Sequence, residues 1–155
     1  GALTTAFMMS FILTYGYSVD GGAIAAKVST IGESRTLGYK THGVDGWFTI
    51  FIRGMLCNWM VSMGVVGAMI STSATSKMLA MWMPVMLFFF MGFEHSIVNM
   101  FLFPFSMIMG GEFTFVDYLV WNELPTVLGN LAGGLCLVGL PLYFTHVRTS
   151  PNRSI

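Results

Sequence analysis

The chain has 155 residues, of which 55% are hydrophobic and 9% are charged. Soluble domains carry about 25% charged residues, so this composition predicts an integral membrane protein. The net charge is zero, which argues against nucleic-acid binding because such proteins carry a basic patch or stripe. Cys57 and Cys136 both lie in apolar segments, and the His, Cys and acidic residues lack metal-ligand spacing. We therefore expect no disulfide framework, no cofactor and no enzyme.

The chain opens on an uncharged apolar segment, Gly1 to Val19, which is just long enough to cross a bilayer. Neither a start Met nor a capping residue precedes it, so we expect a fragment that begins inside a helix. Asp20 ends this predicted span, and Ala23 to Gly46 is the most polar region of the chain. We expect that region to be a connector at the water interface that begins with a short interfacial helix.

A second span is predicted from Trp47 to Ile70, followed by a short polar loop from Ser71 to Lys77. Trp47 suits the membrane interface, where amphipathic rings anchor a helix. We interpret Arg53 as a further anchor, because a long basic side chain near the end of a span can extend outward to the interface. Asn58 lies deeper and is a polar group inside an apolar span.

The longest apolar run extends from about Leu79 to Met109, which exceeds the roughly 20 residues that a spanning helix needs. At its middle it carries Glu94, His95 and Asn99, and ionisable groups at that depth usually face a pore or a polar interior. The excess length predicts two helical pieces with a break at Gly92. Glu94 would then lie near the start of the second piece, where free N–H groups favour anions.

The remaining sequence predicts a loop from Gly110 to Glu123, a last span from Pro125 to His146 and a polar tail from Arg148. The spacing Gly129-x-x-x-Gly133 is typical of closely packed membrane helices. Four apolar segments place the first and third loops on one side of the membrane. The second loop and the tail fall on the other side. Lys and Arg residues divide evenly between the two sides, so they predict no orientation.

Three patterns between residues 51 and 134 resemble one known family. They are FIRGMLCNWMV at 51–61, GFEHSIVNM at 92–100 and NELPTVLGNLAGG at 122–134. In this order and inside membrane spans, they resemble the formate/nitrite transporter family. The similarity covers about Trp47 to Arg148, and the pattern at 92–100 is the most specific. The part before Trp47 matches the family in character alone.

The resemblance implies an all-α, polytopic, aquaporin-like bundle of six spans in two inverted halves. It also implies a homopentamer in the cell membrane in which each protomer has its own pore. Residues 1–155 would form a single membrane-domain fragment, with the end of span three and then spans four to six, and the N-terminal spans missing. The C-terminal tail would lie in the cytoplasm.

The same resemblance implies roles for individual residues. His95 matches the family's central pore histidine, and Phe88 matches an aromatic constriction on its outer side. Neighbouring pore or proton-relay positions fall on Glu94, Asn99 and Asn58. A structural role for Glu94 at the break, and a helix-packing role for Asn58, remain alternatives.

An anion-recruiting site is also implied, although the sequence departs from the family pattern there. The family usually has a lysine before span four, and the ungapped position here is His42. Lys40 lies two residues earlier. We therefore expect Lys40 or His42 to recruit the anion at the outer mouth.

The leading functional hypothesis is a channel or transporter for small monovalent anions such as formate, nitrite or hydrosulfide. An imidazole titrates near neutrality and can exchange a proton with a passing anion, which makes the proton a second transported species. One alternative is an aquaporin-like pore for small neutral solutes, in which His95 only lines the pore. Another is a membrane haem subunit, which needs two histidines at similar depth, whereas His42 and His146 lie near span ends.

Overall fold

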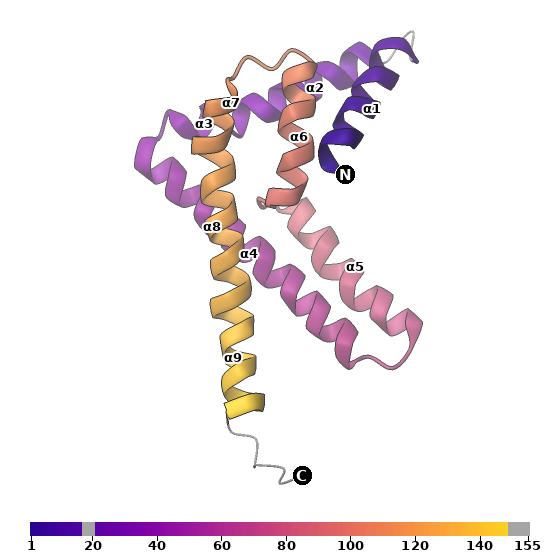
Figure 1. Ribbon diagram of the computed structural model, residues 1–155, viewed down its shortest axis with the longest axis vertical. Helices are drawn as coiled ribbons and strands as arrows, with labels where there is room; N and C mark the ends of the chain where they lie inside the picture. Colours follow the sequence, from indigo (N-terminus) through magenta and orange to yellow (C-terminus); the bar gives the residue numbers. More distant parts are fainter. Residues whose placement is uncertain (17–20, 149–155) are drawn as a thin grey trace.

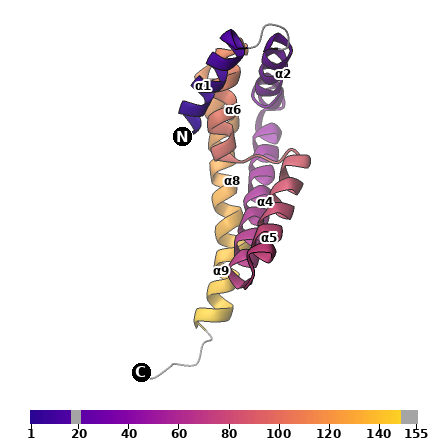
Figure 2. The same ribbon diagram turned by 90° about the vertical axis from the view of Figure 1, so that its right-hand side faces the viewer.

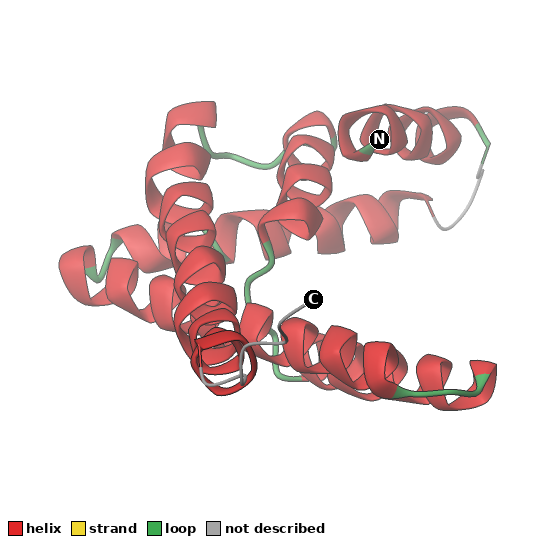
Figure 3. Cartoon of the chain, turned by 60° about the horizontal axis from the view of Figure 1, so that its bottom comes forward, coloured by secondary structure: helices red, strands yellow, loops and turns green. Residues whose placement is uncertain are grey.

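The computed structural model describes residues 1–16 and 21–148, which fold into helices joined by short turns (Figures 1 and 3). No strand occurs in this described part, as the all-α prediction requires. Helices α1 to α6 are Ala2–Tyr15, Gly21–Ser34, Leu37–Lys40, Gly43–Ile70, Ala74–Phe90 and Ser96–Ile108. A last helix, Phe115–Arg148, contains α7 (Phe115–Tyr118), α8 (Leu124–Gly134) and α9 (Leu140–Leu142), with π-helical turns at Leu119–Glu123, Leu135–Gly139 and Tyr143–Arg148.

Two long helices organise the arrangement. Among the described residues, α4 and the last helix are long and apolar enough to cross a membrane. α4 packs against both α8 and α5. α1 lies beside α6, while α2 runs across one end of the bundle and contacts α6 (Figures 1 and 2). α4 thus packs along α5, and α8 contacts α6 on the other side of the α5–α6 turn.

The turns lie at opposite ends of the molecule in the order that four apolar segments predict. α2, α3 and the turn between α6 and α7 lie at one end (Figure 1). The turn between α4 and α5 and the end of the last helix lie toward the other. We call the first of these the connector end.

The predicted broken span is confirmed, because α5 ends at Phe90 and α6 begins at Ser96. The expected loop from Gly110 to Glu123 is wrong beyond Thr114. There the Thr114 hydroxyl accepts a hydrogen bond from Asp117 N at 3.1 Å, and Asp117 Oδ2 accepts from Thr114 N at 3.1 Å. This reciprocal cap starts the last helix at Phe115, ten residues before the predicted Pro125. The predicted end of the first span at Asp20 lies outside the described residues.

Glycines allow α8 to pack directly on the backbone of α4. A Cβ atom on Gly129 would lie 2.2 Å from Phe51 O, and one on Gly133 would lie 2.0 Å from Met55 O. Such distances exclude any side chain, so the small-residue spacing predicted for this span is confirmed as a helix-packing surface. The close approach brings polar groups of α8 within hydrogen-bond distance of α4.

Candidate functional site

The break between α5 and α6 has a defined backbone. Gly92 has φ +65°, a left-handed conformation that side-chain-bearing residues rarely adopt. Its N–H donates to Phe89 O at 3.1 Å, and Phe93 N donates to Phe88 O at 3.0 Å. These bonds close the end of α5 and turn the chain toward α6. His95 then occupies the position just before α6, with Glu94 preceding it, as the sequence predicts.

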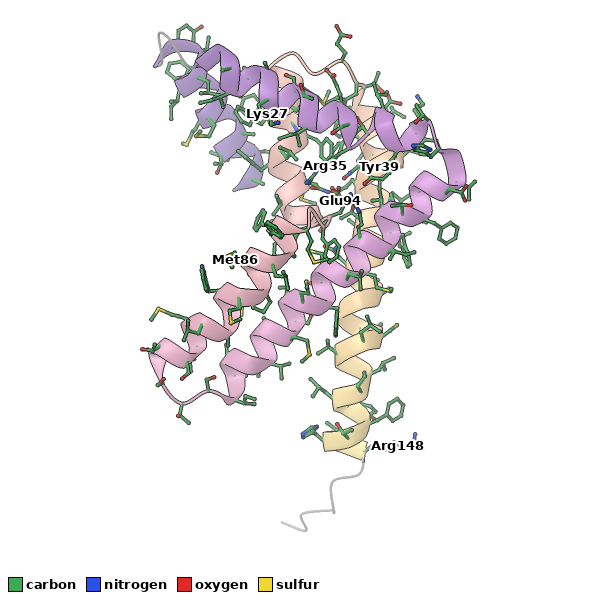
Figure 4. The ribbon with its side chains drawn as sticks, turned by 180° about the vertical axis from the view of Figure 1, so that it is seen from behind. Lys27, Arg35, Tyr39, Met86, Glu94 and Arg148 are labelled. Carbon is green, nitrogen blue, oxygen red and sulfur yellow. The ribbon has the colours of Figure 1, made fainter. Side chains whose placement is uncertain are left out.

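The Glu94 side chain is fully buried and joins three parts of the chain. Its Oε2 accepts hydrogen bonds from Asn99 Nδ2 at 3.0 Å and from Asn122 Nδ2 at 3.4 Å. Arg35 Nη1, from the link between α2 and α3, lies 3.7 Å from the same oxygen. A buried carboxylate needs such partners, because removing an unpaired charge from water is costly. Figure 4 shows Arg35 and Glu94 side by side beneath the connector end.

The three groups around Glu94 also bond to one another. Asn99 Nδ2 donates to Asn122 Oδ1 at 2.7 Å, and Asn122 Nδ2 donates to Arg35 O at 3.0 Å. Asn99 and Asn122 are themselves fully buried. The network therefore fixes α6, the last helix and the connector relative to the break.

Asn130, which also belongs to the last helix, holds the main chain of the break. Its Nδ2 donates to Gly54 O and to Glu94 O, each at 3.0 Å. Its Oδ1 accepts from Ser96 N at 3.2 Å. Asn58 Nδ2 donates to Asn130 O at 2.6 Å, which links the predicted Asn58 position to the same group of residues.

His95 lies beside these networks without joining them. Its half-buried ring stacks against Phe88, with ring centroids 5.7 Å apart and planes inclined by 24°. Its Nδ1 is buried and has no hydrogen-bond partner among the described residues. Phe88 is itself 3% exposed, whereas Phe89 is 56% exposed. The first phenylalanine of the Phe88–Phe90 run therefore contacts the histidine.

The two candidates for anion recruitment lie in different surroundings. Lys40 Nζ forms an ion pair with Asp117 Oδ1 at 2.7 Å, which holds α3 against the start of the last helix. His42 lines a cavity of about 410 Å³ at the connector end. Lys40 does not line this cavity, whereas His42 shares it with Arg35, which contacts Glu94.

Arg53 reaches back from α4 toward α3, the connector helix that precedes it. Its guanidinium donates a hydrogen bond to Tyr39 OH and lies 5.8 Å from the centre of the Tyr39 ring. Burial raises the pKa of Tyr39, against the opposing effect of Arg53. The hydroxyl group of Tyr39 therefore keeps its proton through the physiological range.

Sequence reasoning missed several residues that position the break. Asn130 carries a recognisable signal, because it is an amide in an apolar segment, whereas Asn122 fell in the loop predicted from Gly110 to Glu123. Arg35 carries none, since it lies in a polar connector far along the chain from Glu94. The buried pair in which Tyr118 OH donates to Glu123 Oε2 at 2.9 Å was also missed. Among the described residues, no group of three or more His, Cys, Asp or Glu side chains is arranged to hold a metal ion.

A family model described as formate/nitrite transporter matches residues 1–144. The chain belongs to the formate/nitrite transporter family. A probable formate transporter of Methanothermobacter thermautotrophicus is 31% identical, over 96% of this chain and 55% of that protein. The nitrite transporter NirC of Salmonella typhimurium is 32% identical, over 83% of this chain and 46% of that protein. The chain thus spans about half the length of these relatives.

A solved structure shows the same fold in this family. It is described as a pentameric formate channel with formate bound, and it superimposes with a TM-score of 0.72 at 26% identity. The match covers 92% of this chain and 61% of that chain. The predicted family and the predicted all-α membrane-channel fold are both confirmed.

Proposed function

We propose that this formate/nitrite transporter family protein conducts small monovalent anions across the cell membrane, with proton exchange at His95. Formate, nitrite and hydrosulfide are the candidate substrates. Relatives named as formate and nitrite transporters support the substrate class. The observation that carries the proposal is the His95 imidazole at the helix break, whose buried Nδ1 has no partner among the described residues.

The surroundings of His95 support a proton-exchange role. A bare anion is costly in an apolar constriction, whereas its conjugate acid is neutral. An imidazole titrates in the physiological range and can supply or remove that proton. Phe88 covers one face of the ring and provides an apolar wall, consistent with the proposed constriction.

Glu94 and Asn99 support the site in a different way. Both are fully buried and hydrogen-bonded to each other. We propose that they position His95 by fixing the backbone of the break. Their direct participation in a proton relay stays a prediction, as does a pore-lining role for Asn58.

We further propose a homopentamer in the lipid bilayer, with the C-terminal tail in the cytoplasm. The pentameric structural match supports this assembly. The outer faces of the helices also support it, because they carry large exposed apolar side chains such as Phe7, Phe11, Trp82 and Phe90. Surfaces of this kind suit contact with lipid or with neighbouring subunits.

The test is anion uptake against pH in proteoliposomes. His95→Asn retains a polar side chain but removes the titrating group. We expect assembly to persist, the rate to fall strongly and the pH dependence to disappear. His146→Asn, which removes a histidine at the exposed end of the last helix, is the matched control and should behave like the wild type.

Two outcomes would contradict the proposal. A His95→Asn protein with the wild-type rate and pH profile would leave His95 as a lining residue only. Uptake of neutral solutes without accompanying protons would favour the aquaporin-like alternative. A pH electrode in lightly buffered external medium records proton uptake in the same experiment.

A further inference from the structure

The cavity at the connector end has an unusual charge balance. Its lining residues are Ser34, Arg35, Gly38, Tyr39, His42 and Arg53. Two of these are arginines, and none is acidic. Arg35 is balanced by Glu94, whose Oε2 lies 3.7 Å from Arg35 Nη1. Arg53 has no carboxylate ion-pair partner among the described residues. The lining therefore presents an excess positive charge inside a partly enclosed space.

Two of the polar side chains that line this cavity, Arg53 and Tyr39, contact each other. Arg53 donates to Tyr39 OH, and the arginine also lies over the face of the tyrosine ring. A hydroxyl that accepts a hydrogen bond keeps its own proton available for donation. The bond to Tyr39 uses one N–H of Arg53, so other N–H groups of the guanidinium remain for a ligand. The cavity thus offers a planar cationic donor beside a hydroxyl donor.

We propose that this cavity is a receiving site for a small planar oxyanion, bound by the Arg53 guanidinium and the Tyr39 hydroxyl. A guanidinium presents parallel N–H groups that match two oxygens of one carboxylate or nitrite. Arg35 lines the same cavity and contacts Glu94, the residue before His95. An anion bound there would lie at the connector end, beside the arginine that contacts Glu94. The choice of formate as the probe rests on the proposed function.

The test measures equilibrium binding of ¹³C-formate to the purified protein in detergent. Line broadening of the formate signal during titration reports a saturable site even when affinity is weak. Arg53→Gln removes the charge and should weaken binding about tenfold, because charge-assisted bidentate hydrogen bonds are strong. Arg53→Lys keeps the charge but loses the paired N–H groups of the guanidinium. Its affinity for formate should therefore lie between those of the wild type and Arg53→Gln. Tyr39→Phe removes only the hydroxyl and should weaken binding about threefold, the effect of one hydrogen bond.

Lys27→Gln is the matched control. Lys27 is an exposed cation on α2 at the same end of the molecule, outside the cavity lining. Its removal tests whether surface charge alone attracts formate, and we expect wild-type binding. An equal loss in Lys27→Gln and Arg53→Gln would overturn the proposal, as would non-saturable binding to the wild type.

The elution volume in size-exclusion chromatography verifies folding of each variant. If Arg53→Gln changes that volume, Arg53→Lys and Tyr39→Phe decide the matter, and wild-type affinity in both overturns the proposal. Binding at equilibrium does not require transport. If formate binding is saturable and depends on Arg53 but no uptake occurs, only the proposed function is contradicted. If uptake depends on His95 but Arg53→Gln binds formate like the wild type, only this site is contradicted.

Discussion

Replacing Asn130 with alanine tests how the helix break is held in place. The Asn130 side chain bonds to Gly54 O, Glu94 O and Ser96 N. The Gly54 carbonyl lies within α4, where the helix itself supplies a donor. Glu94 O lies in the break and Ser96 N at the first residue of α6, and among the described residues both bond to the Asn130 side chain. The substitution therefore leaves two backbone groups of the break without a partner.

The expected loss follows from these two groups. A buried backbone group without a partner costs about 1–3 kcal/mol. Asn130→Ala should lower the free energy of unfolding by that amount for the buried Glu94 O, and by a smaller amount for the partly buried Ser96 N. Asn58→Ala is the matched control, because it removes one hydrogen bond to Asn130 O in the middle of α8. That carbonyl keeps its helical partner, so the expected loss is about 0.5–1.5 kcal/mol.

The assay is equilibrium unfolding in mixed micelles with increasing SDS, followed by tryptophan fluorescence. Hydrogen bonds inside membranes tend toward the lower end of such ranges, so the comparison of the two variants carries more weight than either value. Asn130→Ala should also lower anion uptake, because His95 lies between its two backbone contacts. An unfolding free energy no lower than that of Asn58→Ala would refute the reasoning that Asn130 stabilises the break.

Three further predictions concern the constriction, the break and the mouth. Phe88→Ala should widen the constriction and admit lactate or acetate in uptake assays, while Phe90→Ala, at an 88% exposed position, should not. Gly92→Ala should lower the unfolding free energy by about 1–2 kcal/mol, the cost of a left-handed conformation with a side chain; an unchanged value would show that the backbone relaxes. Neutralising Lys40 and His42 together should raise the apparent KM for formate, most strongly at low salt. Unchanged uptake kinetics at low salt would remove both residues from the path.

The sequence alone predicted the features that depend on local pattern. An apolar run too long for one span, with Gly92 near its centre, predicted the break because hydrophobic length and glycine conformation are local properties. Gly129 and Gly133 predicted close helix packing for the same reason. The start of the last helix was also locally encoded, since Thr114 and Asp117 have capping-box spacing. It was missed because the acidic residues around it were interpreted as a loop.

The tertiary structure decided which polar groups meet. Asn122 and Arg35 are 87 residues apart in the sequence, and Asn130 and Glu94 are 36 apart, yet each pair is hydrogen-bonded. Such contacts depend on the rotation and axial position of whole helices, which local sequence patterns do not specify. The same packing pairs Lys40 with Asp117 and turns Arg53 toward Tyr39. The sequence located the ionisable residues, but packing determined which of them form ion pairs with one another.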